Sequence, residues 1–215
     1  MTISLIHPSR GRASKAHETA RNWFDNAGPI KWEYILSCDS NDPELINYDP
    51  LKGAQNMSRI VNDNNSVVEA TNHAAKKSNG DILLYLSDDF KCPDNWGQLI
   101  IDQFQGVTEP MLLKVDDCLQ NFGARVLTIP IMNRQLYERL GYFFHPEYKS
   151  MFCDEHLYNV AEKLHALKFA PQLKFPHEHV CNGKAPDDET YRRSAANWEQ
   201  GKAMFAKHKK LGFPV

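Results

Sequence analysis

The sequence lacks two features that would place a protein outside a reducing cell interior or in a membrane. Its five cysteines are scattered, odd in number and nowhere spaced as CxxC, which excludes a disulfide framework and leads us to expect a cytoplasmic protein. No apolar run approaches the roughly 20 residues of a membrane-spanning helix. The first residues also lack the charged segment and long apolar run of a signal peptide. We therefore expect no transmembrane segment.

Excess positive charge is also absent. The formal net charge is −2, whereas proteins that bind duplex DNA are usually more basic or carry a basic stripe. The densest basic cluster, Lys207-His208-Lys209-Lys210, is short and is typical of a solvated helix end. The chain has no internal repeat. Its 215 residues, of ordinary apolar and charged content, suffice for one domain with a sizeable core.

Strand and helix patterns alternate along the first half of the chain. Strands separated by crossover helices pair in parallel, so the sequence predicts an α/β fold with a mostly parallel central sheet flanked by helices. The polar stretch 39–65 predicts a long loop. The predicted strands cover residues 3–7, 33–38, 82–86, 111–115, 126–131 and 169–175, and the predicted helices cover residues 14–27, 66–78, 93–104, 134–140, 154–167 and 188–209.

The most informative strand is 82–86, a continuous apolar run that ends in Ser87-Asp88-Asp89. Such a run predicts a strand buried on both faces. Open α/β sheets bind ligands at the carboxyl ends of their strands. Adjacent carboxylates repel each other unless a cation joins them, so we expect a divalent metal that holds a phosphorylated ligand. The alternative is that the two acids only cap the following turn.

Two other strand ends belong to the same edge of a parallel sheet. The first runs into Pro8-Ser9-Arg10-Gly11-Arg12, and the second ends in Asp39. Arginine for phosphate, an acid for base or ribose and a metal for pyrophosphate together suit a nucleoside diphosphate. The alternatives are arginines that cap a polar loop and an Asp39 that forms a turn.

The order and spacing of these motifs resemble the GT-A fold glycosyltransferases, in particular the family-2-like group of inverting, metal-dependent enzymes. The resemblance covers roughly residues 2–180 and is strongest over 65–90. It implies a GT-A (Rossmann-like) domain over 1–215, in which 1–115 bind the nucleotide sugar and 116–215, with a C-terminal helix, bind the acceptor. It rests on Pro8-Ser9-Arg10, on Asp39, on the helix with Asn72 that leads into Asn79-Gly80-Asp81, and on Ser87-Asp88-Asp89, which stands where the family carries its DxD-type motif.

The resemblance implies roles for single residues. Asp89, at the third position of the motif, would bind Mn²⁺ or Mg²⁺, and Asp88 would bind the ribose or a metal-bound water. Ser87 stands where the family usually has its first acid. The residues assigned to the nucleotide-sugar donor are Pro8, Arg10, Asp39, Asn72, Ser87 and Asp88.

The second half adds a candidate base. The family places a catalytic acid at the start of a helix on the acceptor side, and here Asp154, or secondly Glu155, has that position. The alternative is that the acid only caps the helix. Lys184, in the loop before Asp187-Asp188, is a further candidate contact for donor phosphates, or else a plain solvated lysine.

Two histidines follow the last predicted strand. The family commonly has a histidine here that completes the metal shell, and His177 and His179 are the candidates. Taking the two side chains to point to opposite faces, we expect only one to reach the metal and leave open which. A separate zinc site made of His177, His179 and Cys181 is the alternative, although a second ligand cluster at a diagnostic spacing is missing.

These features imply a hexosyl- or pentosyltransferase that moves a sugar from a UDP-sugar to an acceptor hydroxyl. The alternatives are a nucleotidyltransferase that acts on a sugar phosphate and a non-catalytic nucleotide-sugar-binding module. The acceptor stays open among a saccharide, a lipid-linked sugar, a protein hydroxyl and a modified nucleic acid base. An aromatic segment either binds it or belongs to the core: Phe143, Phe144, His145, Tyr148 and Phe152.

Overall fold

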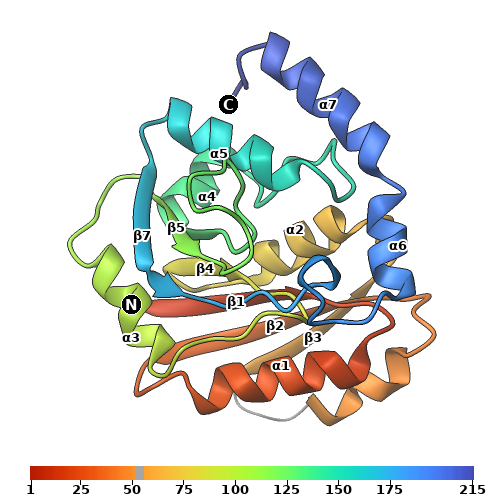
Figure 1. The fold of residues 1–215 in the computed structure, drawn as a ribbon. Coiled ribbons are helices and arrows are strands. Elements are labelled where there is room, and N and C mark those ends of the chain that lie inside the picture. Colours follow the sequence, from red (N-terminus) through yellow and green to blue (C-terminus); the bar gives the residue numbers. More distant parts are fainter. Residues whose placement is uncertain (52–55) are drawn as a thin grey trace.

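One mixed sheet forms the centre of the protein in a computed structural model that describes residues 1–51 and 56–215 (Figure 1). Its strand order is β3-β2-β1-β4-β6-β5-β7. Only β6 runs antiparallel to its neighbours, so the predicted mostly parallel α/β fold is confirmed. The strands are β1 (Thr2–Pro8), β2 (Lys31–Asp39), β3 (Met57–Asn62), β4 (Ile82–Tyr85), β5 (Leu112–Asp116), β6 (Ile131–Asn133) and β7 (Leu167–Lys174).

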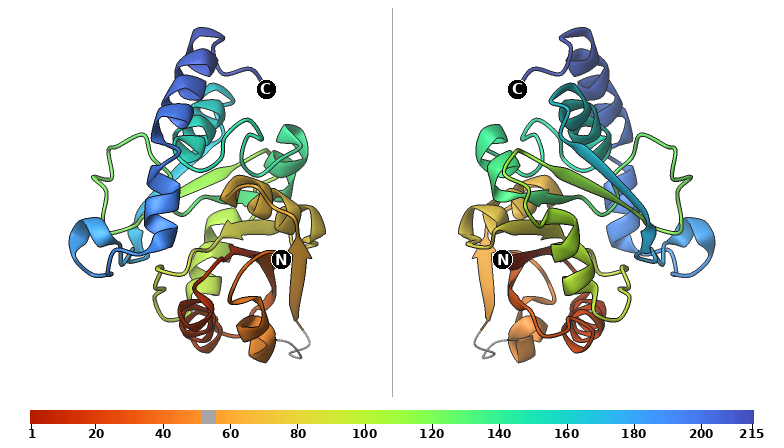
Figure 2. Two further views of the ribbon diagram at one scale, coloured as in Figure 1. Left: turned by 90° about the vertical axis from the view of Figure 1, so that its right-hand side faces the viewer. Right: turned by 90° about the vertical axis from the view of Figure 1, so that its left-hand side faces the viewer.

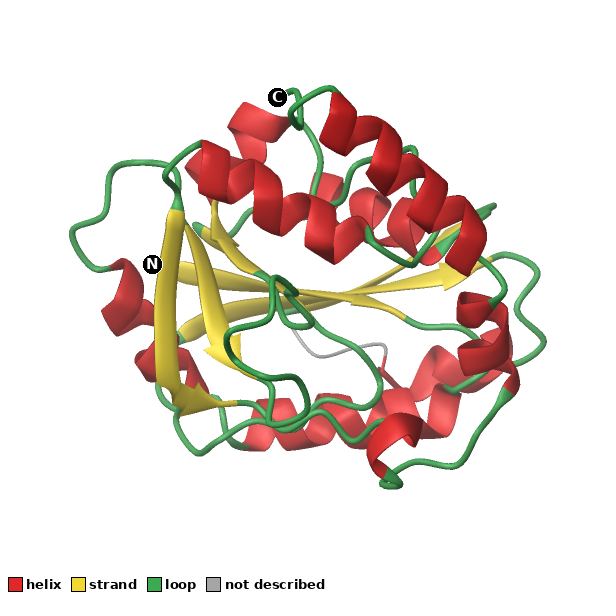
Figure 3. Cartoon of the chain, turned by 45° about the horizontal axis from the view of Figure 1, so that its top comes forward, coloured by secondary structure: helices red, strands yellow, loops and turns green. Residues whose placement is uncertain are grey.

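Helices cover both faces of this sheet (Figures 1 and 3). Helices α1 and α3 pack on one face, and α2, α4 and α5 pack on the other. The last two helices, α6 and α7, run up one side of the molecule (Figure 2). The helices are α1 (Ala13–Asp25), α2 (Val67–Lys77), α3 (Trp96–Phe104), α4 (Arg134–Leu140), α5 (Cys153–Lys163), α6 (Glu189–Ala195) and α7 (Trp198–Lys210), with 3₁₀ turns η1 (Leu45–Leu51) and η2 (Val180–Asn182).

Strand β4 is buried on both faces, as its apolar run predicts. Ile82 and Leu84 belong to the core cluster under α1 and α3, whereas Leu83 belongs to the cluster under α2 and α5. Alternate residues of a strand point to opposite faces, so a strand between two helical layers needs apolar side chains at every position. The apolar run therefore places β4 at the centre of the sheet.

Helix α2 begins as its sequence predicts. The hydroxyl of Ser66 accepts a hydrogen bond from the Glu69 backbone N–H at 3.1 Å, which caps the helix. The Glu69 carboxylate returns to the backbone N–H of Asn65 at 2.8 Å, one residue earlier than in an ideal capping box. This cap brings the positive end of the α2 dipole to the carboxyl edge of the sheet.

Several of the predicted elements are wrong in extent, among them the helix expected over 154–167, which ends at Lys163 and whose last predicted residue begins β7. The predicted loop 39–65 contains the 3₁₀ turn η1 and the edge strand β3; its residues 52–55 lie outside the described residues. The strand expected over 126–131 is only Ile131–Asn133. The single helix expected over 188–209 is two helices, α6 and α7, separated at residues 196–197.

The segments after β4 and β7 are joined beside the sheet. The backbone N–H of Glu178 donates to the carbonyl of Asp89 at 2.8 Å, and Phe90 forms an isolated β-bridge with His177. These bonds bring the end of the second half of the chain to the acidic end of β4. In the described part of the chain, no helix combines the length and apolar character that crossing a membrane requires.

Candidate active site

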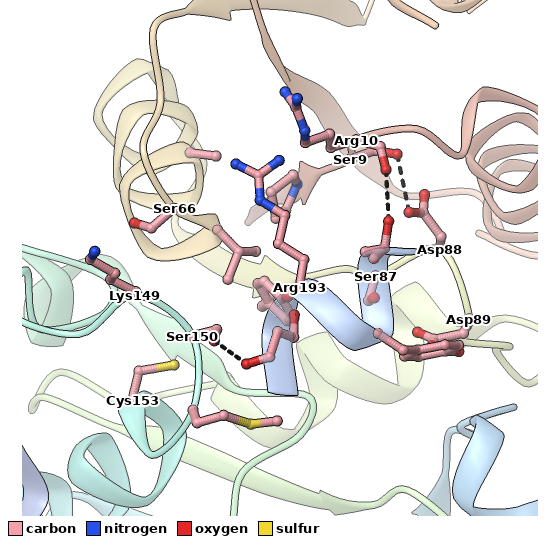
Figure 4. Close-up of a pocket in the computed structure, with 18 of the residues that line it drawn as sticks. Ser9, Arg10, Ser66, Ser87, Asp88, Asp89, Lys149, Ser150, Cys153 and Arg193 are labelled. Atoms are coloured by element: carbon pink, nitrogen blue, oxygen red, sulfur yellow. Dashed lines mark hydrogen bonds between the residues drawn. The ribbon is translucent and has the colours of Figure 1, made fainter. Parts of the chain in front are cut away.

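A cavity of about 320 Å³ opens at the carboxyl edge of β1, β2 and β4 (Figure 4). Its walls come from the ends of these strands, the start of α2, the segment before and at the start of α5, and helix α6. The residues predicted for the site that line it are Pro8, Arg10, Asp39, Ser87, Asp88, Asp89, Asp154, His177 and His179. The rule that parallel strand ends share one edge therefore locates the site.

Asn72, Glu155 and Lys184 do not line this cavity. The Asn72 side chain is occupied elsewhere: its Oδ1 accepts from the backbone N–H groups of Phe143 and Phe144 at 2.9 and 3.0 Å, and its Nδ2 donates to the carbonyl of Phe144 at 2.8 Å. We therefore no longer assign Asn72 to the donor, because its amide is hydrogen-bonded to the backbone of Phe143 and Phe144. Lys184 is exposed in the loop after η2.

The two adjacent acids have different surroundings. His7 Nε2 donates to Asp88 Oδ1 at 2.9 Å. The Ser9 hydroxyl donates to Asp88 Oδ2 at 3.0 Å (Figure 4). Because a carboxylate only accepts, His7 carries a proton on Nε2, and its Nδ1 lies 2.7 Å from the Tyr34 hydroxyl. Both oxygens of Asp88 thus accept from buried partners, which fix the carboxylate at the strand ends.

Asp89 retains an oxygen for a ligand. Its Oδ2 lies 3.2 Å from His177 Nε2 and accepts from the Tyr191 hydroxyl at 2.8 Å, while its buried Oδ1 has no hydrogen-bond partner among the described residues. Burial alone raises the pKa of this carboxyl. The hydrogen bond and charge of His177, with smaller contributions from Tyr191 and Ser87, outweigh burial and hold the pKa well below its usual range. Asp89 is therefore ionised.

His177 and His179, the two histidines after β7, both lie close to Asp89. One ligand atom each from Asp89, His177 and His179 lie within 4.8 Å of one another, and the two imidazole rings have centroids 5.0 Å apart. The premise that the two side chains point to opposite faces is wrong, because residues two apart on an extended segment share a face and both line the cavity. Burial and the neighbouring His177 lower the pKa of His179, which favours its neutral, ligating form.

Helix α6 forms a wall that is fixed to the first strand end. The Arg12 guanidinium makes two hydrogen bonds to Asp188, at 2.9 and 2.7 Å, and lies 4.1 Å from the centre of the Tyr191 ring. Asp188 also caps α6 by accepting from the Tyr191 backbone N–H. A paired fork of this kind is geometrically specific, so it sets where Tyr191 meets Asp89.

The remaining cations at the cavity differ in how they are held. Arg10 donates to Asp39 Oδ2 at 2.9 Å, and Asn64 donates to Asp39 Oδ1 at 2.9 Å, so this pair is held within the protein. Arg193 and Lys149 also line the cavity, and both are exposed. These two side chains are the ones at the cavity best placed to meet an anionic ligand, together with the start of α2.

Asp154 occupies the first turn of α5 and lines the cavity from a different wall than Asp89. Burial raises the pKa of its carboxyl to about 6, and the charges of Glu155 and Asp117 add to the effect, while a backbone N–H of Glu155 opposes it. A carboxylate with a pKa near neutrality can take up a proton at physiological pH.

The sequence matches no protein-family model and no curated protein. Solved structures do match. The mannosyltransferase PcManGT from Pyrobaculum calidifontis, in complex with GDP-Man and Mn²⁺, aligns with a TM-score of 0.72 over 95% of this chain and 64% of its own, at 13% identity. S. aureus TarS 1–349 with UDP aligns with a TM-score of 0.66 over 81% of this chain and 59% of its own, at 13% identity. The chain has the GT-A glycosyltransferase fold.

A further structure of TarS 1–349, with UDP-GlcNAc, aligns with a TM-score of 0.65 over 81% of this chain and 57% of its own, at 14% identity. This chain thus spans about three fifths of the length of these proteins. At this identity the likeness shows the fold alone.

Most residues of the aromatic segment 143–152 belong to the hydrophobic core. Phe143, Phe144 and Tyr148 are buried, and of these only Phe144 lines the cavity. Phe152 packs against Trp198 of α7, with ring centroids 4.9 Å apart. Of the two interpretations left open by the sequence, the core interpretation describes these rings.

Sequence reasoning missed Tyr191, Arg193 and Lys149. The available signal was the run Tyr191-Arg192-Arg193 after the second acid pair of the loop, but a single predicted helix over 188–209 concealed that α6 is a separate element at the cavity. Lys149 precedes the segment that carries Asp154, and nothing in its own sequence surroundings distinguishes it from a solvated lysine.

Proposed function

We propose that this chain is a metal-dependent glycosyltransferase that moves a sugar from a nucleotide-sugar donor, a UDP-sugar, to an acceptor hydroxyl with inversion. One observation carries the proposal: a single cavity gathers an acid and two imidazoles, exposed cations, and a second acid with a raised pKa on another wall. The GT-A neighbours, solved with UDP, UDP-GlcNAc or GDP-Man, support a nucleotide-sugar donor.

Asp89, His177 and His179 would hold the divalent ion. Asp89 Oδ1 and His177 Nδ1 are buried and lack hydrogen-bond partners among the described residues, as atoms reserved for a ligand would. A mixed set of carboxylate and imidazole donors suits Mn²⁺ better than Mg²⁺, which prefers oxygen ligands and keeps its water. When bound, the ion supplies positive charge that stabilises the leaving nucleoside diphosphate.

The protein's own groups would bind and orient the donor. Arg193 and Lys149 lie at the cavity where they can pair with diphosphate oxygens, and the capped start of α2 adds backbone N–H groups and a positive dipole. Asp39, oriented by Arg10 and Asn64, is a fixed acceptor for a base or ribose. These contacts would hold the anomeric carbon toward the wall that carries Asp154.

Asp154 is the proposed base. As the acceptor oxygen forms its bond to the anomeric carbon, the hydroxyl proton passes to the Asp154 carboxylate. The bond between that carbon and the diphosphate oxygen breaks, and the diphosphate leaves with the electron pair. One base on the acceptor side and one displacement give inversion, whereas a retaining enzyme needs no base there. The acceptor itself is left to experiment.

A panel of nucleotide sugars tests the proposal. Each is added with and without Mn²⁺, and both the melting temperature and donor hydrolysis are measured. We expect a UDP-sugar to raise the melting temperature and to be hydrolysed only with the metal, because a ligand that binds the folded state stabilises it. A panel in which no donor stabilises the protein or is hydrolysed contradicts the proposal. Release of pyrophosphate from UTP and a sugar 1-phosphate would show a nucleotidyltransferase instead.

A further inference from the structure

Three histidines from separate segments converge inside the second half of the chain, away from the proposed donor site. His145 lies between α4 and α5, His156 in α5 and His208 in α7. Their ring centroids are 4.4 to 4.8 Å apart, and one ligand nitrogen from each lies within 4.8 Å of the others. His156 and His208 are only 0% and 3% exposed. We call these three residues the histidine cluster.

In two of these rings one nitrogen is hydrogen-bonded and the other is not. His208 Nε2 donates to Glu147 Oε2 at 2.7 Å, and His156 Nδ1 lies 3.2 Å from the Tyr148 hydroxyl. Their other nitrogens, His208 Nδ1 and His156 Nε2, are buried and have no hydrogen-bond partner among the described residues. Buried polar atoms without a hydrogen-bond partner are rare and unfavourable, so two in one cluster call for a ligand.

The third ring is also available. His145 Nδ1 accepts only a long hydrogen bond, 3.3 Å, from the Glu147 backbone N–H. An imidazole nitrogen that carries no proton is the form that ligates metals.

We propose that the histidine cluster binds Zn²⁺ and that the ion fastens α7 to α5. Neutral imidazole nitrogens are ligands that zinc prefers. The carboxylate of Glu147 on the far nitrogen of His208 is the outer partner that orients zinc-bound histidines. Zn–N bonds of about 2.0–2.1 Å place tetrahedral nitrogens roughly 3.4 Å apart, so binding draws the three rings closer and leaves a fourth position for water.

Such a fastening would add to the limited packing of α7. Of its residues only Gly201 and His208 are buried, while Met204 and Phe205 pack against the core partly buried. Gly201 lies so close to the Met151 carbonyl that a Cβ there would be 2.3 Å from that oxygen, and Met151 lines the donor cavity. An ion on His156 and His208 would therefore hold both α7 and the wall that carries Asp154.

Zinc retention tests the site independently of the donor site. The full chain carrying Asp89→Asn and His177→Ala, which disables the other metal group, is incubated with Zn²⁺ alone, dialysed and analysed for zinc. We expect about one zinc per chain. Adding His145→Ala or His208→Ala should remove it, whereas the matched control His165→Asn, at an exposed histidine whose positive φ Asn tolerates, should keep it.

A measurement on the unaltered cluster guards against variants that fail to fold. Co²⁺ in place of Zn²⁺ should give the intense visible absorption of a four-coordinate site in the Asp89→Asn, His177→Ala chain, and Zn²⁺ should raise its melting temperature. No retained zinc with no Co²⁺ spectrum overturns the proposal, as does retained zinc in a folded His208→Ala chain. Neither result depends on the outcome of the nucleotide-sugar panel.

Discussion

The Tyr191 hydroxyl donates a hydrogen bond to Asp89 Oδ2 at 2.8 Å across 102 positions of the sequence. The same ring lies against the Arg12 guanidinium, which is paired with Asp188. One network of contacts around Asp89, the proposed metal ligand, therefore joins the end of β4, the loop after β1 and helix α6. Such a partner of a metal-binding carboxylate fixes its orientation.

Replacing Tyr191 by Phe tests this network. The loss of one donor to Asp89 should lower the affinity for Mn²⁺ about ten- to hundredfold, the range typical of groups that orient a metal ligand. The measurement is donor hydrolysis as a function of Mn²⁺ concentration. Tyr137→Phe, in α4 and outside the cavity, is the matched control. If Tyr191→Phe and the wild type depended equally on Mn²⁺, Tyr191 would have no role in orienting Asp89 for the metal.

Replacing Asp88 should reduce stability, whereas replacing the adjacent Asp89 should abolish metal-dependent donor binding. Asp88 bonds His7 and Ser9 inside the protein, so Asp88→Asn should lower the free energy of unfolding by about 1–3 kcal/mol, measured by urea denaturation. Asp89→Asn should abolish the stabilisation by Mn²⁺ and donor, measured as a shift in melting temperature. If instead Asp88→Asn lost metal-dependent stabilisation while keeping its stability, the assignment of the metal to Asp89 would be reversed.

The sequence could predict the site where one physical rule governed the placement. Parallel strands bring their carboxyl ends to one edge, so Arg10, Asp39 and Asp89 could be placed together from the pattern alone. The same holds for the double-faced burial of β4, because an unbroken apolar run is stable only between two layers.

Pairings between distant segments could not be predicted. Asn72 lies on α2, and its polar side chain suggested a contact with the ligand. Instead it forms hydrogen bonds with the backbone of Phe143 and Phe144, some seventy positions away. Strand β3 is an edge strand with exposed residues, so it lacks the apolar signal of a central strand. The break between α6 and α7 at residues 196–197 has no Gly or Pro, the residues that usually signal the end of a helix in a sequence.

Asp154→Asn should separate binding from chemistry. The variant should keep donor- and Mn²⁺-dependent stabilisation but lose transfer by two orders of magnitude or more, the range for removal of a general base. In the wild type, kcat/KM should fall as the pH drops below about 6, where the raised pKa of Asp154 leaves the base protonated, and should level off above it. A variant with full turnover would exclude Asp154 as the base.

The same raised pKa has a consequence for stability. The folded state binds the Asp154 proton more tightly than the unfolded state, whose carboxyl titrates near 3.8, so the ionised carboxylate destabilises the fold at neutral pH. Asp154→Asn should therefore raise the melting temperature at pH 7. The gain should shrink as the pH falls below about 6 and vanish below about pH 3, where both states are protonated. A lower melting temperature at pH 7 would contradict a raised pKa of the Asp154 carboxyl.

Arg193 and Arg192 provide an internal comparison for donor binding. Both are exposed on α6, but Arg193 lines the cavity, whereas Arg192 pairs with Asp187 outside it. A charge-assisted hydrogen bond is worth about 1.5–3 kcal/mol, so Arg193→Ala should raise the KM for the donor at least about tenfold while kcat changes less. Arg192→Ala removes the same charge from the same helix and should leave both constants near the wild-type values. Equal effects in the two variants would mean that the charge of α6 attracts the donor from a distance, and a rise in ionic strength would then weaken both alike.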